Sequence, residues 1–255
     1  MTCSSMSSPS PGPDRSARIA VIGCGALTID IERAAQALGQ DVDFYPLPPL
    51  LHNHPERIAP AVAGLIEELR PRYADIAIGY ADCGTYGALD ELCAEHGLRR
   101  LAGDHCYDAY AGRERIAALM AEHPGTYLLT DFLIAGFDRL VWRELGLDRH
   151  PELLADYFGN YEQVAWLAVH RTADLERAAG RVAERLGLPL LIIDCAAADG
   201  ARAPFEAALA AAIRQQQLPK ELRDRLGIRP GRFAGVDLAG DPLQERAADG
   251  AREDA

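Results

Sequence analysis

Short apolar runs alternate with amphipathic segments along most of the chain. Apolar runs at residues 18–23, 42–47, 75–80, 126–131, 164–169 and 189–194 predict strands, and a shorter run at 99–103 predicts a seventh. The segments between them repeat apolar residues at the three- and four-residue spacing of helices. Strands that are apolar throughout are typical of parallel sheets buried on both faces. The pattern predicts an α/β fold in which one parallel sheet of about six or seven strands has helices on both faces, built from Rossmann-like units.

Both ends of the chain lack this periodicity. Residues 1–17 are rich in Ser and Pro, and residues 240–255 are rich in charge. Neither segment has an apolar face to bury. We expect a disordered leader over 1–17, an α/β domain over 18–239 with room for two Rossmann-like subdomains, and a disordered tail over 240–255.

Charge and cysteine content narrow the class of function. The 255 residues carry a formal net charge of -12, which argues against nucleic acid or an anionic membrane as a partner. No apolar segment approaches the roughly twenty residues of a membrane span, and the leader has no apolar signal core, so we expect a cytoplasmic protein with a small-molecule substrate. In a reducing compartment, the six cysteines indicate metal binding or thiol chemistry rather than disulfides.

Four cysteines stand just after predicted strands. Cys24 follows the first strand, Cys83 the third and Cys106 the short run at 99–103, and Cys195 follows the last. Ligands of open parallel sheets bind at the carboxyl ends of the strands, so these thiols are expected on one rim. A thiol between a strand and a helix start also ionises easily.

Three thiolates on one rim predict a metal site. Cys24, Cys83 and Cys106 would hold a zinc ion or an iron–sulfur cluster and leave one coordination position open for substrate. Other polar or small residues of the same loops would complete the site. Asp131, His52 and His105 are the predicted proton-transfer residues, and Gly25, Gly84, Asp82 and Asn53 the predicted cofactor contacts.

Other interpretations of the same residues stay open. The cysteines could simply be packed under loops, as free cysteines often are. Asp131 or His54 could cap a helix. Residues 22–28, IGCGALT, resemble a dinucleotide turn, but Thr28 stands where a third glycine is needed. In a metal-free enzyme the nucleophile would be Cys83 or Cys106, the base His52, His54 or His105, and the acid orienting that base Asp82 or Asp104.

Five short motifs occur in order along the chain: CGAL, LHNHP, DCGTYGALD, GDHCY and LTDFL. Together they resemble a bacterial and archaeal family catalogued as a domain of unknown function, family 1638, over about residues 18–200. Members often lie beside genes of corrinoid-dependent methyltransferases, so the resemblance implies one-carbon metabolism and a methyltransferase or corrinoid protein as a candidate partner. A looser, fold-level analogy is to quinolinate synthase, in which three cysteines hold a cluster with one open iron.

The sequence thus predicts a metalloenzyme acting on a small polar substrate. An iron–sulfur site favours a lyase or desulfidase, and a zinc site favours methyl transfer to a thiol. The alternative is a non-catalytic accessory protein that carries a corrinoid or a metal for a methyltransferase. A corrinoid is the weaker expectation, because the chain lacks a D-x-H-x-x-G sequence.

Overall fold

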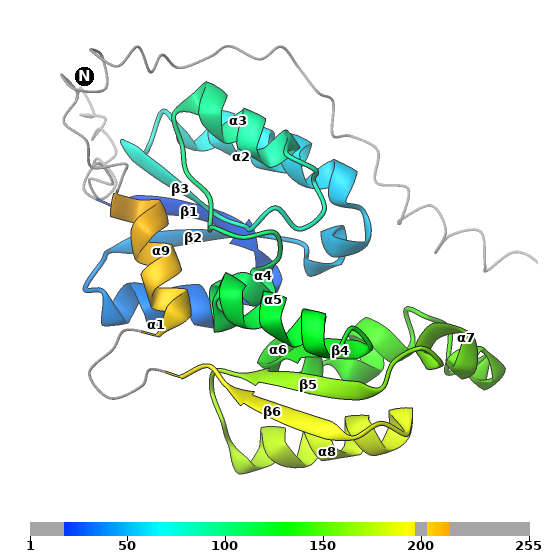
Figure 1. Ribbon diagram of the computed structural model, residues 1–255. Coiled ribbons are helices and arrows are strands. Elements are labelled where there is room, and N and C mark those ends of the chain that lie inside the picture. The colour runs from blue at the N-terminus through cyan, green and yellow to red at the C-terminus, as the bar shows by residue number, and fades with distance from the viewer. Residues whose placement is uncertain (1–17, 197–202, 215–255) are drawn as a thin grey trace, which may run out of the picture.

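The computed structural model describes residues 18–196 and 203–214 (Figure 1). The leader and tail predicted to be disordered, and most of 197–239, lie outside the described residues. Six parallel strands are present, in two sheets of three. The first sheet has the order β2-β1-β3, with β1 at Ile19–Cys24, β2 at Val42–Leu47 and β3 at Asp75–Gly79. The second has the order β4-β5-β6, with β4 at Thr126–Thr130, β5 at Gln163–Ala168 and β6 at Leu190–Asp194.

The α/β class and the parallel pairing were predicted correctly, but a single sheet of six or seven strands is wrong. The strand expected at 99–103 reduces to one parallel bridge between Ile78 and Arg100. A strand that is apolar throughout indicates that both of its faces are buried, but this pattern does not identify the neighbouring strand. Here helices α4 and α5 follow the bridge and separate the third strand from the fourth (Figure 1).

Helices fill the connections in the order expected for a parallel sheet. Several begin or end in short turns, among them a π-helical turn at Asp138–Trp142. The α-helices are α1 (Thr28–Ala37), α2 (Ile58–Leu69), α3 (Ala88–His96), α4 (Cys106–Ala111), α5 (Arg113–Glu122), α6 (Asp131–Ala135), α7 (Leu154–Phe158), α8 (Ala173–Leu186) and α9 (Pro204–Arg214). None of the helices in the described ranges is long and apolar enough to cross a membrane.

The two sheets share a central core. In β1, Ile19 and Val21 face this core, while Ala20 and Ile22 face α2 and α3 on the other side. Strand β5 alternates in the same way, with Ala165 and Leu167 in the central core and its other residues packed towards α8. Helices α1, α4, α5 and α9 therefore lie between the sheets, while α2 and α3 cover the outer face of the first sheet and α8 covers that of the second (Figure 1).

Candidate functional site

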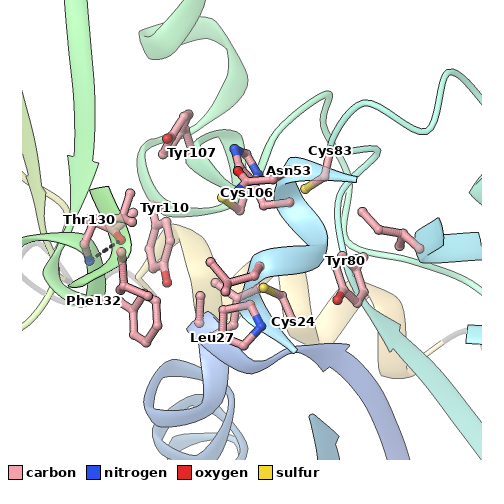
Figure 2. Close-up of a pocket in the computed structure, with 17 residues that line it drawn as sticks. Cys24, Leu27, Asn53, Tyr80, Cys83, Cys106, Tyr107, Tyr110, Thr130 and Phe132 are labelled. Atoms are coloured by element: carbon pink, nitrogen blue, oxygen red, sulfur yellow. Dashed lines mark hydrogen bonds between the residues drawn. The ribbon is translucent and has the colours of Figure 1, made fainter. Parts of the chain in front are cut away.

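A pocket of about 90 Å³ lies between the two sheets, near the carboxyl ends of β1, β3 and β4. Cys24, Cys83 and Cys106 all line it, and Figure 2 shows their sulfur atoms facing a common space. A volume of this size has room for several water molecules. The expectation that these three cysteines share one rim is confirmed. The rest of the wall is mostly apolar or aromatic, and includes Tyr80, Tyr107, Tyr110, Phe132, Leu133 and Leu140.

Backbone hydrogen bonds between two loops bring Cys83 beside Cys106. The Asp82 N–H donates to the Gly103 carbonyl at 3.2 Å, and the Cys83 N–H donates to the Asp104 carbonyl at 2.8 Å. Arg100 holds the second loop in place, because its guanidinium also donates to the Gly103 carbonyl at 2.8 Å. The two cysteines are thus positioned by backbone, and their proximity does not depend on side-chain packing alone.

Cys83 does not stand at the start of a helix, as its sequence position suggested. Helix α3 begins only at Ala88, and Cys83 lies in the preceding turn with φ of 50°. A non-glycine residue in this left-handed region is strained, and such strain is found mainly where surrounding contacts impose it, often at functional sites. The turn therefore presents the Cys83 side chain to the pocket at a conformational cost.

The three thiols differ in acidity. A hydrogen bond from the Cys106 thiol lowers the pKa of Cys83, and this outweighs the effect of burial. The same hydrogen bond, together with burial, raises the pKa of Cys106. Burial raises the pKa of Cys24 to about 11. Cys83 is thus the thiol of the pocket that ionises first.

Tyr80 lies beside Cys24 and was not singled out by sequence. Its side chain lines the pocket and is almost fully buried. Burial and the neighbouring Cys24 raise the pKa of its phenol, so the hydroxyl keeps its proton. This hydroxyl has no hydrogen-bond partner of standard geometry among the described residues. Its place two residues before Asp82, at the end of an apolar run, was the one available signal.

The predicted histidines separate into two groups. His52 lines the pocket together with Asn53, and burial lowers the pKa of His52, which favours the neutral imidazole. His54 lies outside the pocket lining, 3.6 Å from Glu56. His105 precedes α4 and also lies outside the lining, although it is near enough to His52 to lower its pKa further.

Three of the predicted cofactor contacts have structural roles in their loops. The Asp82 carboxylate accepts hydrogen bonds from the Thr85 hydroxyl at 2.7 Å and from the Tyr86 and Gly87 N–H groups. Although burial opposes ionisation, these bonds lower the pKa of Asp82. Gly84 has φ of +83°, and a side chain at Gly25 would come within 2.9 Å of a backbone oxygen. None of the three lines the pocket, and their contact with a cofactor stays a prediction.

Asp131 lies behind the pocket wall, between the lining residues Thr130 and Phe132. Both of its carboxylate oxygens accept hydrogen bonds, one from the indole N–H of Trp166 and one from the backbone N–H of His170, each at 2.7 Å. The side chain thus joins the end of β4 to β5 and the loop that follows. Its proton-transfer role stays a prediction, and from this position it would act through a neighbour.

A buried polar network next to Asp131 was missed at the sequence level. Asp30 in α1 lies 3.0 Å from the His170 imidazole and accepts a hydrogen bond from the Tyr110 hydroxyl at 2.5 Å. These residues come from three distant segments, and Tyr110 also lines the pocket. An Asp in the first turn of a helix normally indicates only a favourable interaction with the helix dipole, so no local pattern identified it.

No group of three or more His, Cys, Asp or Glu side chains within residues 18–196 and 203–214 is arranged to bind a metal ion. Zinc–sulfur bonds of about 2.3 Å place the sulfurs of one tetrahedral zinc about 3.8 Å apart. Cys83 and Cys106 are hydrogen-bonded neighbours, whereas the Cys24 thiol interacts with Tyr80. The donor set is three soft sulfurs, which suits zinc or iron–sulfur clusters, but its spacing is not that of a preformed single-ion site.

The remaining described cysteines lie in the core. Cys93 is buried in α3, and burial raises its pKa to about 12. Cys195 is buried after β6, with a pKa raised to about 11, and does not line the pocket. Both are packed thiols and serve as natural controls for the other three.

Comparison with known proteins identifies one family. The model of the family described as "Protein of unknown function (DUF1638)" matches residues 46–199. This range includes Cys83 and Cys106 but begins after Cys24. No curated protein and no solved structure matches the chain, so the analogy to quinolinate synthase gains no support.

Proposed function

The chain belongs to the DUF1638 family, and we propose that it is a metal-dependent enzyme in which Cys24, Cys83 and Cys106 hold an iron–sulfur cluster or a zinc ion. The observation that carries this proposal is the convergence of three cysteines from three separate strand-to-helix loops on one pocket. Packed cysteines have no reason to meet in a cavity. Cys93 and Cys195, which are packed, lie away from it.

The arrangement of the sulfurs does not favour one kind of metal site over the other. A cluster offers a different iron to each cysteine, so it would require Cys83 and Cys106 to move apart from their hydrogen-bonded contact. Zinc would require Cys24 to leave Tyr80 and approach the other two thiols. In either case three protein ligands leave one position open, and a metal there polarises a bound substrate.

The chain itself supplies groups that bind substrate and move protons. His52 is the one histidine among the described residues that line the pocket, and its lowered pKa lets it accept a proton at neutral pH. Asn53 offers an amide beside it. The reaction classes that fit are elimination or desulfuration at a cluster, or methyl transfer to a thiol at zinc. The association with a methyltransferase or corrinoid partner and the cytoplasmic location belong to the same proposal.

Anaerobic purification followed by metal, sulfide and visible-spectrum analysis tests this function. Iron with acid-labile sulfide supports the cluster, and zinc alone supports the single-ion site. Cys24→Ser, Cys83→Ser and Cys106→Ser should each lose most of the metal while circular dichroism stays that of an α/β protein. Cys93→Ser and Cys195→Ser are the matched controls and should keep it. Equal metal content in all five variants would overturn the proposal.

The lowered pKa of Cys83 favours a second candidate, a metal-free enzyme with Cys83 as nucleophile. In this case Cys106 donates a hydrogen bond to the thiolate and His52 is the proton acceptor in the same pocket. The two candidates differ in their dependence on Cys24. A nucleophilic Cys83 needs no thiol at position 24, so Cys24→Ser should leave its reactivity towards electrophiles unchanged.

A further inference from the structure

The Tyr80 hydroxyl is a hydrogen-bond donor in the wall of the cysteine pocket whose one neighbouring acceptor among the described residues is the Cys24 sulfur. The residue is 2% exposed, and the hydroxyl is buried and unpartnered within the described part of the chain. Buried polar groups are nearly always hydrogen-bonded, so an exception on a cavity wall indicates a missing ligand. The adjacent Cys24 sulfur is a weak acceptor and does not replace an oxygen.

The charge of the side chains that line the pocket indicates the net charge of the missing ligand. No Lys or Arg is among the described residues that line it. Proteins that bind carboxylates or phosphates normally provide such a cation, often an Arg that binds both oxygens. The pocket is therefore suited to an uncharged molecule.

The opposite wall of the pocket is apolar. Phe132, Leu133 and Leu140 line the pocket and come from the segment after β4. Phe132 lies across the pocket from Tyr80 of the first sheet (Figure 2). A ligand that reaches from Tyr80 to these residues needs an oxygen at one end and a hydrocarbon part at the other. The cavity of about 90 Å³ limits it to a few heavy atoms beyond the groups that the metal site occupies.

We propose that the pocket binds a small uncharged carbonyl compound, such as an amide or a ketone, whose oxygen accepts a hydrogen bond from Tyr80 while its alkyl part packs against Phe132, Leu133 and Leu140. This rests on the proposed function and names its substrate class. The carbonyl end lies on the cysteine side of the pocket. Tyr80 is then a substrate-binding residue that orients the oxygen beside the open coordination position.

Propanamide and propionate are a matched pair of probes, because they have the same size and differ in charge. Binding of each to the full chain is measured by ligand-observed NMR, on the purified protein and again after metal removal. Propanamide should bind, and in the metal-free protein propionate should bind at least about tenfold more weakly, since no Lys or Arg lines the pocket to bind a carboxylate.

Tyr80→Phe should weaken propanamide binding by roughly 3- to 10-fold, the effect of losing one neutral hydrogen bond. Tyr127→Phe is the matched control, because Tyr127 packs against Phe158 and Tyr161 outside the pocket and should leave binding unchanged. Equal binding of the two probes, no binding of propanamide, or an unchanged affinity in Tyr80→Phe would each overturn the inference. Metal content is measured separately, so amide binding through Tyr80 to a protein that purifies without metal would refute the proposed function and not the ligand class.

Discussion

Removing the Cys106 thiol should make Cys83 less reactive, because the Cys106 hydrogen bond is the main cause of the lowered Cys83 pKa. The perturbation is Cys106→Ala in metal-free protein. In the unmodified protein the pKa of Cys83 is lowered from its ordinary thiol value, whereas that of Cys24 is raised to about 11. The two thiols line the same pocket, so they share access to a small reagent.

The expected difference follows from these values. At pH 7 a thiol with a pKa of about 8.5 is ionised about 300 times more than one with a pKa of about 11. The thiolate with the higher pKa is intrinsically more nucleophilic. With a Brønsted coefficient of about 0.45, this makes it react about 13 times faster per thiolate and so offsets part of the difference in ionisation. An ordinary thiol should therefore react about 20 times faster than Cys24. Cys83, whose pKa is lowered, should likewise react faster than Cys24 and faster than the buried Cys93.

Isotope-coded iodoacetamide and peptide mass spectrometry give the rate at each cysteine from pH 6 to 10. Cys106→Ala should move the Cys83 profile to higher pH and reduce its rate at pH 7 severalfold, because the donor is gone and burial remains. Cys106→Ser keeps a donor and should have the smaller effect, and Cys195→Ala, at a packed thiol outside the pocket, should have none. If Cys83 reacts no faster than Cys24, or if Cys106→Ala leaves its profile unchanged, the interpretation of Cys83 as the activated thiol is wrong.

Three further substitutions test the surroundings of the pocket by urea unfolding. Asp82→Ala should lower the free energy of unfolding by about 0.5–2 kcal/mol, because the 85–87 turn loses the carboxylate that accepts its hydrogen bonds. Since the pKa of Asp82 is lowered in the folded protein, this loss of stability should be full at pH 7 and should disappear as the pH falls through the folded-state pKa. Asp131→Ala should cost about 1–3 kcal/mol, because the buried Trp166 N–H loses its partner, and a cost near zero would show that water replaces the carboxylate. Burial raises the pKa of Asp30, so the stability it contributes is full below its unfolded value of about 3.9 and is lost as the pH rises through the folded value. Asp30→Asn should therefore gain stability relative to the unmodified protein as the pH rises above about 4. A stability difference that does not depend on pH would refute this assignment.

Local patterns were sufficient to locate the strands and to place the cysteines. The run at 126–131 was identified as a strand from its apolar residues alone, and it forms β4 at Thr126–Thr130. Cys24 and Cys83 were placed near strand ends because the apolar runs stop there. These predictions hold because strand formation depends on the nearest residues and on burial, and both are visible in a short window of sequence.

The division of six strands into two sheets was decided by tertiary structure. Residues 99–103 look like an edge strand, yet the chain makes one bridge at Arg100 and turns into α4, so β4 starts a second sheet. Sheet partners depend on how whole faces pack, and each apolar strand is compatible with several neighbours. For the same reason the sequence could not show that Cys195 lies apart from the other cysteines. Its strand belongs to the second sheet, and its side chain is buried in the core.

The polar chemistry of the site also depended on long-range contacts. Asp30 and His170 are 140 positions apart and meet at 3.0 Å, and Tyr80 has an unpartnered hydroxyl only because the pocket opens beside it. The sequence by itself determined which residues carry thiols, carboxylates and hydroxyls and on which elements they stand. Tertiary structure decided which of them face one another, because burial and hydrogen bonding arise between segments whose approach no local pattern encodes.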